Sequence, residues 1–193
     1  MSEFYKIHAL AAFEDIIKVK DRIKNIVKNL KLLSRNESSS TIINSSEDFL
    51  SIIENFLSLR LDFKGIEFEV IKSFKEEFKV SFVEISLSQI LNNLVTNAID
   101  ELQESSPEVK KIWINIITTD DLVLLSVEDS GSGISEENID KIFDPLFTTK
   151  DIGKGTGLGL SISKRLALDM GGDLKYVRSE KTRFELSLKK VNS

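Results

Sequence analysis

The N-terminal part of the chain carries an apolar residue at every third or fourth position from Ile16 to Leu33. Lysine and aspartate residues lie among the intervening positions. This spacing predicts a long helix with one apolar seam, which packs either on its own domain or on a partner helix. The serine- and asparagine-rich residues 34–48 then indicate a linker. We therefore expect a helical segment over 1–41 and a separate domain over 42–193.

Beyond the linker, helical and strand periods alternate along the chain. Ser45 with Asp48, and Ser86 with Gln89, have the spacing of capping boxes that open helices. The strand patterns come mostly in hairpin-like pairs, which predicts a two-layer α/β sandwich: a mixed, largely antiparallel sheet with helices on one face. The expected elements are a helix over 47–63, strands over 66–74 and 78–85, a helix over 88–104, strands over 111–119 and 122–129, helices over 135–143 and 161–172, and strands over 174–179 and 182–190.

Composition narrows the classes of function. The chain has 193 residues, of which 41% are hydrophobic, enough for a sizeable core, and its net charge of -5 argues against nucleic acid as a partner. It contains no cysteine and one histidine, which excludes disulfides and thiolate metal sites and fits a cytoplasmic setting. The sequence shows neither a run of ~20 apolar residues nor a signal peptide, so we expect no membrane segment in this chain.

Two glycine-rich segments suggest ligand contacts. "EDSGSGI", residues 128–134, follows a predicted buried strand and consists mostly of residues with very small side chains. Such a segment suggests that a ligand approaches its backbone closely. "GKGTGLGL", residues 153–160, runs into a helix, where backbone N–H groups and the helix dipole favour an anion. Its spacing fits neither the dinucleotide pattern G-x-G-x-x-G nor the phosphate loop that ends in G-K-[ST]. Phosphate binding by another kind of loop is the hypothesis that remains, beside that of a merely flexible loop.

Asn93 and Asn97 lie four residues apart on an otherwise apolar helix and therefore share a face. Amide oxygens are hard ligands that suit magnesium with phosphate and water, so the pair is a candidate metal and phosphate contact. Spacing alone leaves open that both amides only satisfy neighbouring backbone groups.

Four motifs occur in a diagnostic order: "NNLVTNAID", "VEDSGSGI", "IFDPLFTTK" and "GKGTGLGLSISK". Together they resemble the ATP-binding catalytic domain of the sensor histidine kinases, within the superfamily that also includes gyrase, the mismatch-repair ATPases and a heat-shock chaperone. The resemblance covers roughly residues 42–190. The preceding helix, which ends in "LLSR" at Leu32 to Arg35, resembles the second helix of these kinases' dimerisation domain.

The resemblance implies roles for individual residues. Asn97 matches the magnesium ligand of the family, and Asn93 matches a phosphate contact one turn earlier. Asp129 matches the aspartate that accepts a hydrogen bond from the adenine amino group, and Gly131 and Gly133 match glycines that let the base lie against the backbone.

The resemblance also implies a mobile lid, roughly residues 144–158. Phe143 and Phe147 match an aromatic pair that packs its hinge, and Leu158 and Leu160 match residues that anchor the following helix. Thr182, on the last strand, matches loosely a threonine near the adenine. The remaining nucleotide contacts are assigned to Phe147, Lys154, Gly155, Thr156, Gly157, Leu158, Gly159 and Thr182.

The resemblance implies that the domain transfers the γ-phosphoryl group of Mg-ATP to a histidine on the first dimerisation helix. A response regulator then receives the phosphoryl group from that histidine. His8 lacks the acidic neighbour and the proline of that motif, because Ala9 and Phe13 stand in their places. We therefore expect the acceptor histidine on another segment or chain, and possible homodimerisation through the N-terminal helix.

Two alternatives stay open from the sequence. The related serine kinases that inhibit sigma factors share the nucleotide motifs, but "FDPLFTTK" and the "LLSR" helix count against them. A non-catalytic nucleotide-sensing or dimerisation module would account for the absence of a recognisable acceptor motif.

Overall fold

The computed structural model describes residues 42–58, 65–151, 155–178 and 181–191, together with the single positions 13, 16, 19, 20, 23 and 27. These single positions are helical, as the N-terminal seam predicts. Their apolar side chains are exposed, from 66% at Phe13 to 45% at Val27. The other positions of the seam lie outside the described residues, as do His8 and Lys154.

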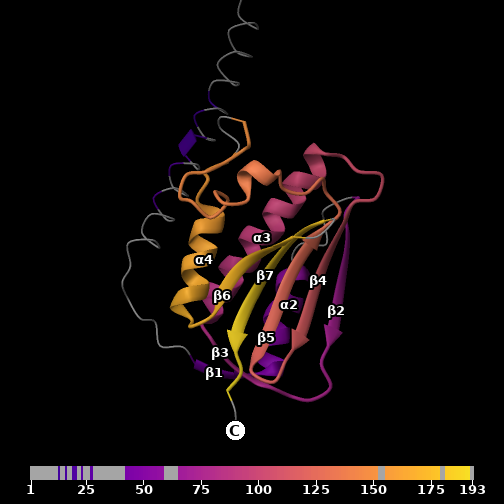
Figure 1. The fold of residues 1–193 in the computed structure, drawn as a ribbon, viewed down its shortest axis with the longest axis vertical. Coiled ribbons are helices and arrows are strands. Elements are labelled where there is room, and N and C mark those ends of the chain that lie inside the picture. The colour runs from indigo at the N-terminus through magenta and orange to yellow at the C-terminus, as the bar shows by residue number, and fades with distance from the viewer. Residues whose placement is uncertain are drawn as a thin grey trace, which may run out of the picture.

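From Ile42 onward, the described chain forms alternating helices and strands (Figure 1). The helices are α2 (Ser46–Ser58), α3 (Glu84–Glu104), α4 (Gly159–Asp169) and the short 3-10 helix η1 (Glu136–Asn138). The strands are β1 (Ile42–Ser45), β2 (Glu67–Ser73), β3 (Lys79–Phe82), β4 (Lys111–Thr118), β5 (Leu122–Asp129), β6 (Asp173–Arg178) and β7 (Thr182–Lys189). Each predicted element has a counterpart, and β1 is an additional strand within the expected linker.

Five strands form the main sheet in the order β2-β4-β5-β7-β6, while β1 and β3 form a separate two-stranded sheet. The main sheet is antiparallel except that β2 runs parallel to β4. The predicted sandwich with a mixed, largely antiparallel sheet is therefore confirmed. The expectation of local hairpins is wrong for β2 and β3, which do not pair with each other.

Aromatic packing explains why β3 leaves its neighbour in the sequence. The rings of Phe78 and Phe82 meet Phe49 of α2 edge-on, with centroids 6.1 and 5.5 Å apart. These contacts hold β3 beside the helices, where it pairs with β1. The chain then returns to the main sheet through α3, which provides the long connection that the parallel pairing of β2 and β4 requires.

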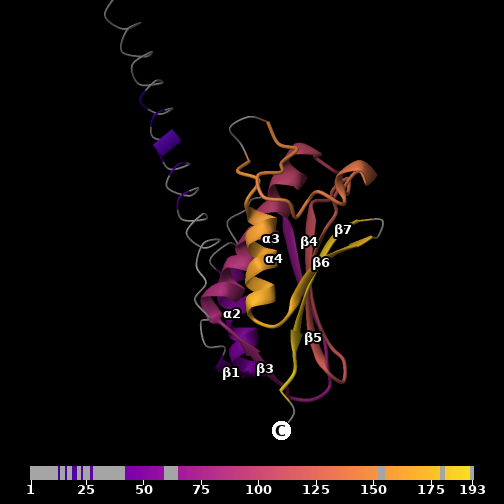
Figure 2. The ribbon, with the colours of Figure 1, turned by 60° about the vertical axis from the view of Figure 1, so that its left-hand side comes forward.

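The three helices cover one face of the main sheet, as Figure 2 shows. The core lies between the two layers because the strands alternate in burial, with Ile112, Ile114 and Ile116 of β4 fully buried. On the helical side, α3 carries eight buried residues and is the central element of its layer. Packing in this core therefore fixes the position of α3 relative to the end of β5.

The two predicted capping boxes have different outcomes. At the first, the hydroxyl of Ser45 accepts a hydrogen bond from Asp48 N at 3.1 Å, and the carboxylate of Asp48 accepts one from Ser45 N at 3.0 Å. That prediction is confirmed. The second is wrong, because α3 begins at Glu84 after Val83 and has no side-chain cap. Leu87 N donates to Val83 O at 2.9 Å, so the helical hydrogen bonds begin before Ser86.

The segment after β5 is less helical than predicted. The helix expected over 135–143 is reduced to η1, followed by turns that bring Ile142 to 7% exposure. This irregular segment and the described residues between it and α4 lie at one end of the sandwich. Within the described part of the chain, none of the helices has the length and apolar content that a membrane crossing demands.

Candidate nucleotide-binding site

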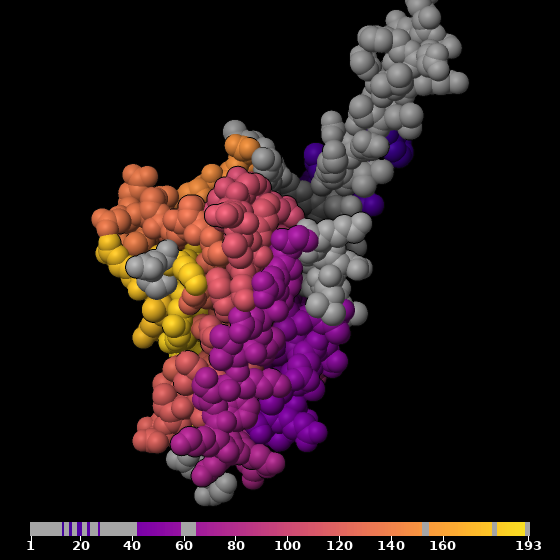
Figure 3. All heavy atoms as spheres, turned by 90° about the vertical axis from the view of Figure 1, so that its right-hand side faces the viewer, coloured from indigo at the N-terminus to yellow at the C-terminus, as the bar shows by residue number. Residues whose placement is uncertain are grey.

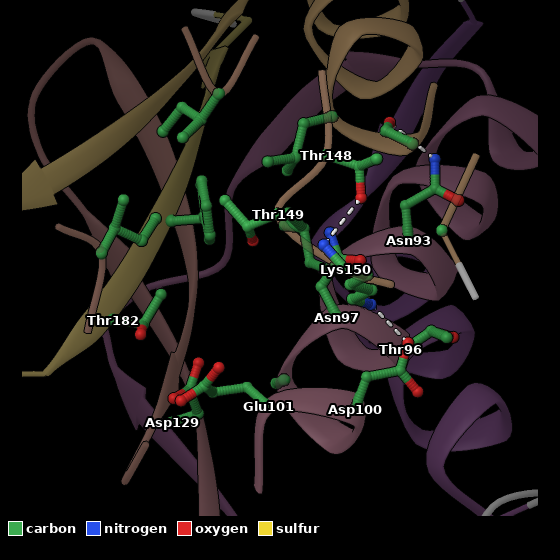
Figure 4. Close-up of a pocket in the computed structure, with 18 of the residues that line it drawn as sticks. Asn93, Thr96, Asn97, Asp100, Glu101, Asp129, Thr148, Thr149, Lys150 and Thr182 are labelled. Carbon is green, nitrogen blue, oxygen red and sulfur yellow. Dashed lines mark hydrogen bonds and ion pairs between the residues drawn. The ribbon is translucent and has the colours of Figure 1, made fainter. Parts of the chain in front are cut away.

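A cavity of about 840 Å³ lies at the end of the sandwich where β5 finishes and α4 begins. Its walls are α3, the ends of β5 and β7, and the loop between β5 and α4 (Figure 4). Figure 3 shows the same end from the side, where the orange loop adjoins the C-terminal part of α3. The predicted site residues that line this cavity are Asn93, Asn97, Asp129, Gly133, Phe147, Gly155, Thr156, Gly157, Gly159 and Thr182.

The structure distinguishes the two asparagines of α3. Asn93 Nδ2 donates hydrogen bonds to Gly159 O and to Ser163 Oγ, both at 3.0 Å, and its Oδ1 accepts one from Gln89. Asn93 therefore ties α3 to the start of α4. Asn97, one turn later, lines the cavity and has no hydrogen bond to another described residue. Its amide is the one that is available to a ligand.

Asp129 and Thr182 lie opposite each other at the ends of β5 and β7, where they are paired in register. Both are buried, at 4% and 7% exposure. The hydroxyl of Thr182 adjoins the carboxylate, yet it forms no hydrogen bond of normal geometry with any described residue. A buried hydroxyl without a partner is costly, so this corner of the cavity is suited to a polar ligand.

The environment of Asp129 disfavours its charge. Burial raises the pKa of the carboxyl to about 6, and the nearby charge of Glu101 adds to this rise. A hydrogen bond from Gly131 N to Asp129 Oδ1, at 2.9 Å, acts in the opposite direction. At neutral pH the group is therefore an ionised, buried acceptor next to the cavity.

Glu101 is a second carboxylate at this corner, and it holds the glycine-rich turn after β5. Its Oε1 accepts hydrogen bonds from Ser132 N at 3.1 Å and from Ser132 Oγ at 2.7 Å. A Cβ on Gly131 would lie 2.5 Å from Glu101 Cγ, so this glycine is required by the close approach of Glu101. Gly133 has a φ of 85°, which favours glycine for a different reason.

The loop between β5 and α4 is fastened at both ends. Leu146 N donates to Gly157 O at 2.9 Å, and a Cβ on Gly157 would lie 2.4 Å from the carbonyl carbon of Leu146. Phe143 packs edge-on against Phe184 of β7, with centroids 6.2 Å apart. Leu158, 1% exposed, anchors the other end. These contacts place Gly155 and Gly157 beside the cavity.

The N-terminus of α4 also faces the cavity. Gly159 and Leu160, its first residues, line the wall, and the preceding Leu158 provides no side-chain cap. The N–H groups of a first helical turn have no partner within the helix. Together with the helix dipole, they form a favourable place for an anion.

Lys150 and Asp100 were not among the residues that the sequence indicated. Lys150 Nζ lies 2.5 Å from Asp100 Oδ2 and joins the loop to α3. Both residues line the cavity near Asn97, away from Asp129 and Thr182 (Figure 4). The cavity thus has a buried polar corner on the sheet and a charged side between helix and loop.

Comparison with known proteins shows the family. The profile of the family described as histidine kinase-, DNA gyrase B-, and HSP90-like ATPases matches residues 82–192, more than half of the chain. The chain belongs to this ATPase family. The resemblance inferred from the four motifs is thereby confirmed.

Named relatives place this ATPase domain among histidine kinases. Sporulation kinase D of Bacillus subtilis is 31% identical over 159 residues, which cover 82% of this chain and 30% of that protein. The aerobic respiration control sensor protein ArcB of Escherichia coli is 37% identical over 131 residues, 65% of this chain and 16% of that protein. The catalytic domain of the histidine kinase ThkA superposes with a TM-score of 0.64 at 31% identity, covering 78% of this chain and 99% of that one.

The chain spans less than a third of the length of these two curated relatives, but it matches nearly the whole of the ThkA catalytic domain. The shared part is the catalytic ATPase domain of histidine kinases. The cavity described above lies within the matched residues 82–192 of this domain.

The residues of this ATPase site fit a magnesium ion that has a single protein ligand. Among the described residues, no three histidine, cysteine, aspartate or glutamate side chains converge as a cage. The uncommitted amide of Asn97 offers one hard oxygen ligand. An ion with one protein ligand takes its others from phosphate and water, as magnesium does in many nucleotide sites.

The sequence contained a signal for Glu101 but none for the ion pair. Asn93, Asn97 and Glu101 are spaced four apart, so a polar stripe along one face of α3 predicts that all three point in one direction. Lys150 and Asp100 are 50 positions apart, and only the path of the loop brings them together.

Proposed function

We propose that this domain binds Mg-ATP and transfers its γ-phosphoryl group to a histidine of another segment or chain. The observation that carries the proposal is one cavity with two unlike ends. The buried acceptor Asp129 and the unpartnered Thr182 stand at one end, and Asn97 and the N-terminus of α4 stand at the other. Its volume of about 840 Å³ suits a ligand of nucleotide size.

The base end would recognise adenine by hydrogen bonding. The ionised Asp129 would accept from the exocyclic amino group, and the hydroxyl of Thr182 would gain the partner that it lacks. A guanine presents a carbonyl oxygen where adenine has the amino group, so the carboxylate would repel it. Placement of Asp129 at the end of a paired strand makes this recognition rigid.

The phosphate end would position the γ-phosphoryl group. Asn97 would hold the magnesium ion, which would offset the charge of the phosphates when bound. The backbone N–H groups of Gly157 and of the first turn of α4, with Gly155 beside them, would face the phosphate oxygens. Asn93 would fix the distance between α3 and α4 through Gly159 and Ser163. The contribution of the domain is orientation and electrostatic stabilisation.

The proposal extends to the partners and the organisation of the chain. A histidine nitrogen on a dimerisation domain or partner chain would attack the γ-phosphorus, and ADP would leave. The phosphoryl group would then pass to the receiver domain of a response regulator. We assign residues 1–41 to a partial dimerisation segment through which two chains could associate, and residues 42–193 to catalysis. A cytoplasmic site of action follows from the use of ATP.

Transfer to an added acceptor tests the function directly. The full chain is mixed with a separately produced acceptor-helix domain and with ATP labelled in the γ-phosphate, with and without magnesium. We expect acid-labile phosphohistidine on the acceptor in the presence of magnesium. Asn97→Ala should reduce this transfer at least about 100-fold, because the ion loses its only protein ligand among the described residues.

Asn55→Ala is the matched control, since Asn55 is an exposed asparagine on α2, which contributes nothing to the cavity wall. It should transfer phosphate as the wild type does. Full transfer by Asn97→Ala would remove Asn97 from the metal site. ATP binding without transfer to any acceptor would instead favour a nucleotide-sensing module, and label on a serine would favour the sigma-factor type of kinase.

A further inference from the structure

The ion pair between Lys150 and Asp100 connects two walls of the cavity. Lys150 Nζ lies 2.5 Å from Asp100 Oδ2, and the side chains are 22% and 38% exposed. Lys150 N also donates to Thr148 Oγ1 at 3.2 Å, which fixes the backbone of the loop at that point. The lysine is therefore well placed in the cavity, while its partner is the more solvated of the two.

The charges around the cavity make this lysine conspicuous. Among the described residues that line the cavity, Lys150 is the only cation, whereas Asp100, Glu101 and Asp129 are carboxylates. A polyphosphate entering this surface meets repulsion from three acids and attraction from one base. An opposite charge within a few ångströms in a partly desolvated site has a large effect on affinity.

Lys150 lies on the side of the cavity assigned to phosphate. Asp100, its partner, follows Asn97 by three residues on α3, and Gly155 packs so closely that an added Cβ would be 3.3 Å from Lys150 Cβ. Figure 4 shows Lys150 beside Asn97 and apart from Asp129 and Thr182. The stem of Lys150 therefore lies beside Gly155, and its ammonium group reaches α3 at Asp100, three residues after the candidate magnesium ligand.

We propose that Lys150 is a phosphate-binding residue that Asp100 holds in the nucleotide-free protein, so that nucleotide binding exchanges the carboxylate for phosphate oxygens. The inference rests on the proposed function in one respect, namely that phosphates occupy this end. Phosphate carries more charge than a carboxylate, and the more exposed Asp100 can return to water at small cost. Asp100 then acts as a competitor that lowers affinity, and Lys150 as a contact that raises it.

The test is whether substitutions of Lys150 and of Asp100 change nucleotide affinity in opposite directions. Binding of ATP, ADP and adenosine to the full chain is measured by calorimetry, with NMR titration for the weak ligand. Lys150→Ala should weaken ATP and ADP binding about tenfold and leave adenosine unchanged, because a charged contact to phosphate is lost. Asp100→Asn should strengthen ATP and ADP binding roughly threefold, also without an effect on adenosine. Lys150→Arg should keep most of the affinity.

The pair Lys72 and Glu54 provides matched controls, because it has a similar separation of 2.6 Å and lies outside the cavity. Lys72→Ala and Glu54→Gln should leave every affinity unchanged. If Lys150→Ala and Asp100→Asn both weaken ATP binding, the ion pair only holds the loop, and the inference is wrong. It is also wrong if neither variant changes ATP affinity.

The two proposals fail in different ways. A wild-type protein that binds ATP but transfers no phosphate contradicts the proposed kinase function and leaves the exchange intact. A wild-type protein that binds neither ATP nor adenosine contradicts both. Unchanged adenosine binding in each variant shows that the fold and the base end are preserved.

Discussion

The two ends of the cavity are built from different kinds of structure. Asp129 and Thr182 belong to strands paired in register and are 4% and 7% exposed. Lys150 and Asp100 belong to a loop and a helix surface, with side chains 22% and 38% exposed. In the proposed function, the base end would therefore recognise its ligand with groups that cannot move far, whereas the phosphate end would bind charged groups with side chains that can change partners.

This difference has an energetic consequence for the base end. A buried carboxylate destabilises the fold unless a ligand or solvent compensates its charge. The raised pKa of Asp129 reflects this loss of stability. At the phosphate end, Lys150 and Asp100 compensate each other. We therefore expect that Asp129 lowers the stability of the ligand-free fold while it favours ligand binding. We expect no such conflict for Lys150 and Asp100.

Asp129→Asn gives the largest expected effect. Asparagine has nearly the same shape and can still accept from Gly131, but it presents an amide instead of a charged acceptor to the adenine. We expect ADP and adenosine affinity to fall roughly 100-fold, the upper range for a hydrogen bond to a charged group. Calorimetry at pH 7.5 measures both ligands.

Glu128→Gln is its control, because Glu128 is the preceding residue of the same strand and its side chain faces Lys181, away from the cavity. Its ligand affinities should equal those of the wild type. Equal affinity in Asp129→Asn as well would break the assignment of adenine recognition to the sheet end.

The same substitution should stabilise the protein without ligand. The pKa of Asp129 is about 6 in the fold against an ordinary value of 3.8, so the folded protein binds the proton more tightly than the unfolded chain. The ionised group therefore destabilises the fold above pH 6, and this loss disappears as the pH falls through 6 toward 3.8. Asp129→Asn should raise the free energy of unfolding by about 2 kcal/mol at pH 7.5.

Urea denaturation at a series of pH values measures this effect. The advantage of Asp129→Asn over the wild type should be full at pH 7.5 and should vanish near pH 4. A constant difference across this range would mean that the charge of Asp129 is not its cause. Glu54→Gln, on α2 and outside the cavity, serves as the reference for loss of one carboxylate.

The position of Asp129 could be predicted from the sequence because a local pattern determines it. An apolar strand followed by "EDSGSGI" places Asp129 at a strand end, and that adenine is its ligand stays a prediction from the motif order. The polar stripe on α3 likewise predicts that Asn93 and Asn97 share a face. That Asn93 binds Gly159 and Ser163 while Asn97 stays free depends on how α4 packs, and spacing carries no information about that.

The unpredicted features all depend on contacts between distant segments. The pair of Lys150 and Asp100 requires the path of an irregular loop, which has no period to reveal it. The parallel pairing of β2 with β4 depends on β3 leaving the sheet to pack on Phe49. In both cases packing between segments far apart in the sequence decided the outcome, and no local pattern carries that information.

Asn93→Ala gives the smallest expected effect and the opposite sign in stability. It removes two hydrogen bonds from α3 to the start of α4, one to Gly159 O at the cavity wall and one to the hydroxyl of the fully buried Ser163. Because Asn93 and Gly159 line the cavity, water can enter the space that the amide vacates, and we expect a loss of about 1 kcal/mol in the free energy of unfolding, with unchanged adenosine binding. Gln103→Ala on the exposed face of the same helix should change neither quantity. A gain in stability for Asn93→Ala would mean that residues at both ends of the cavity reduce the stability of the fold. The proposed difference between the two ends would then be wrong.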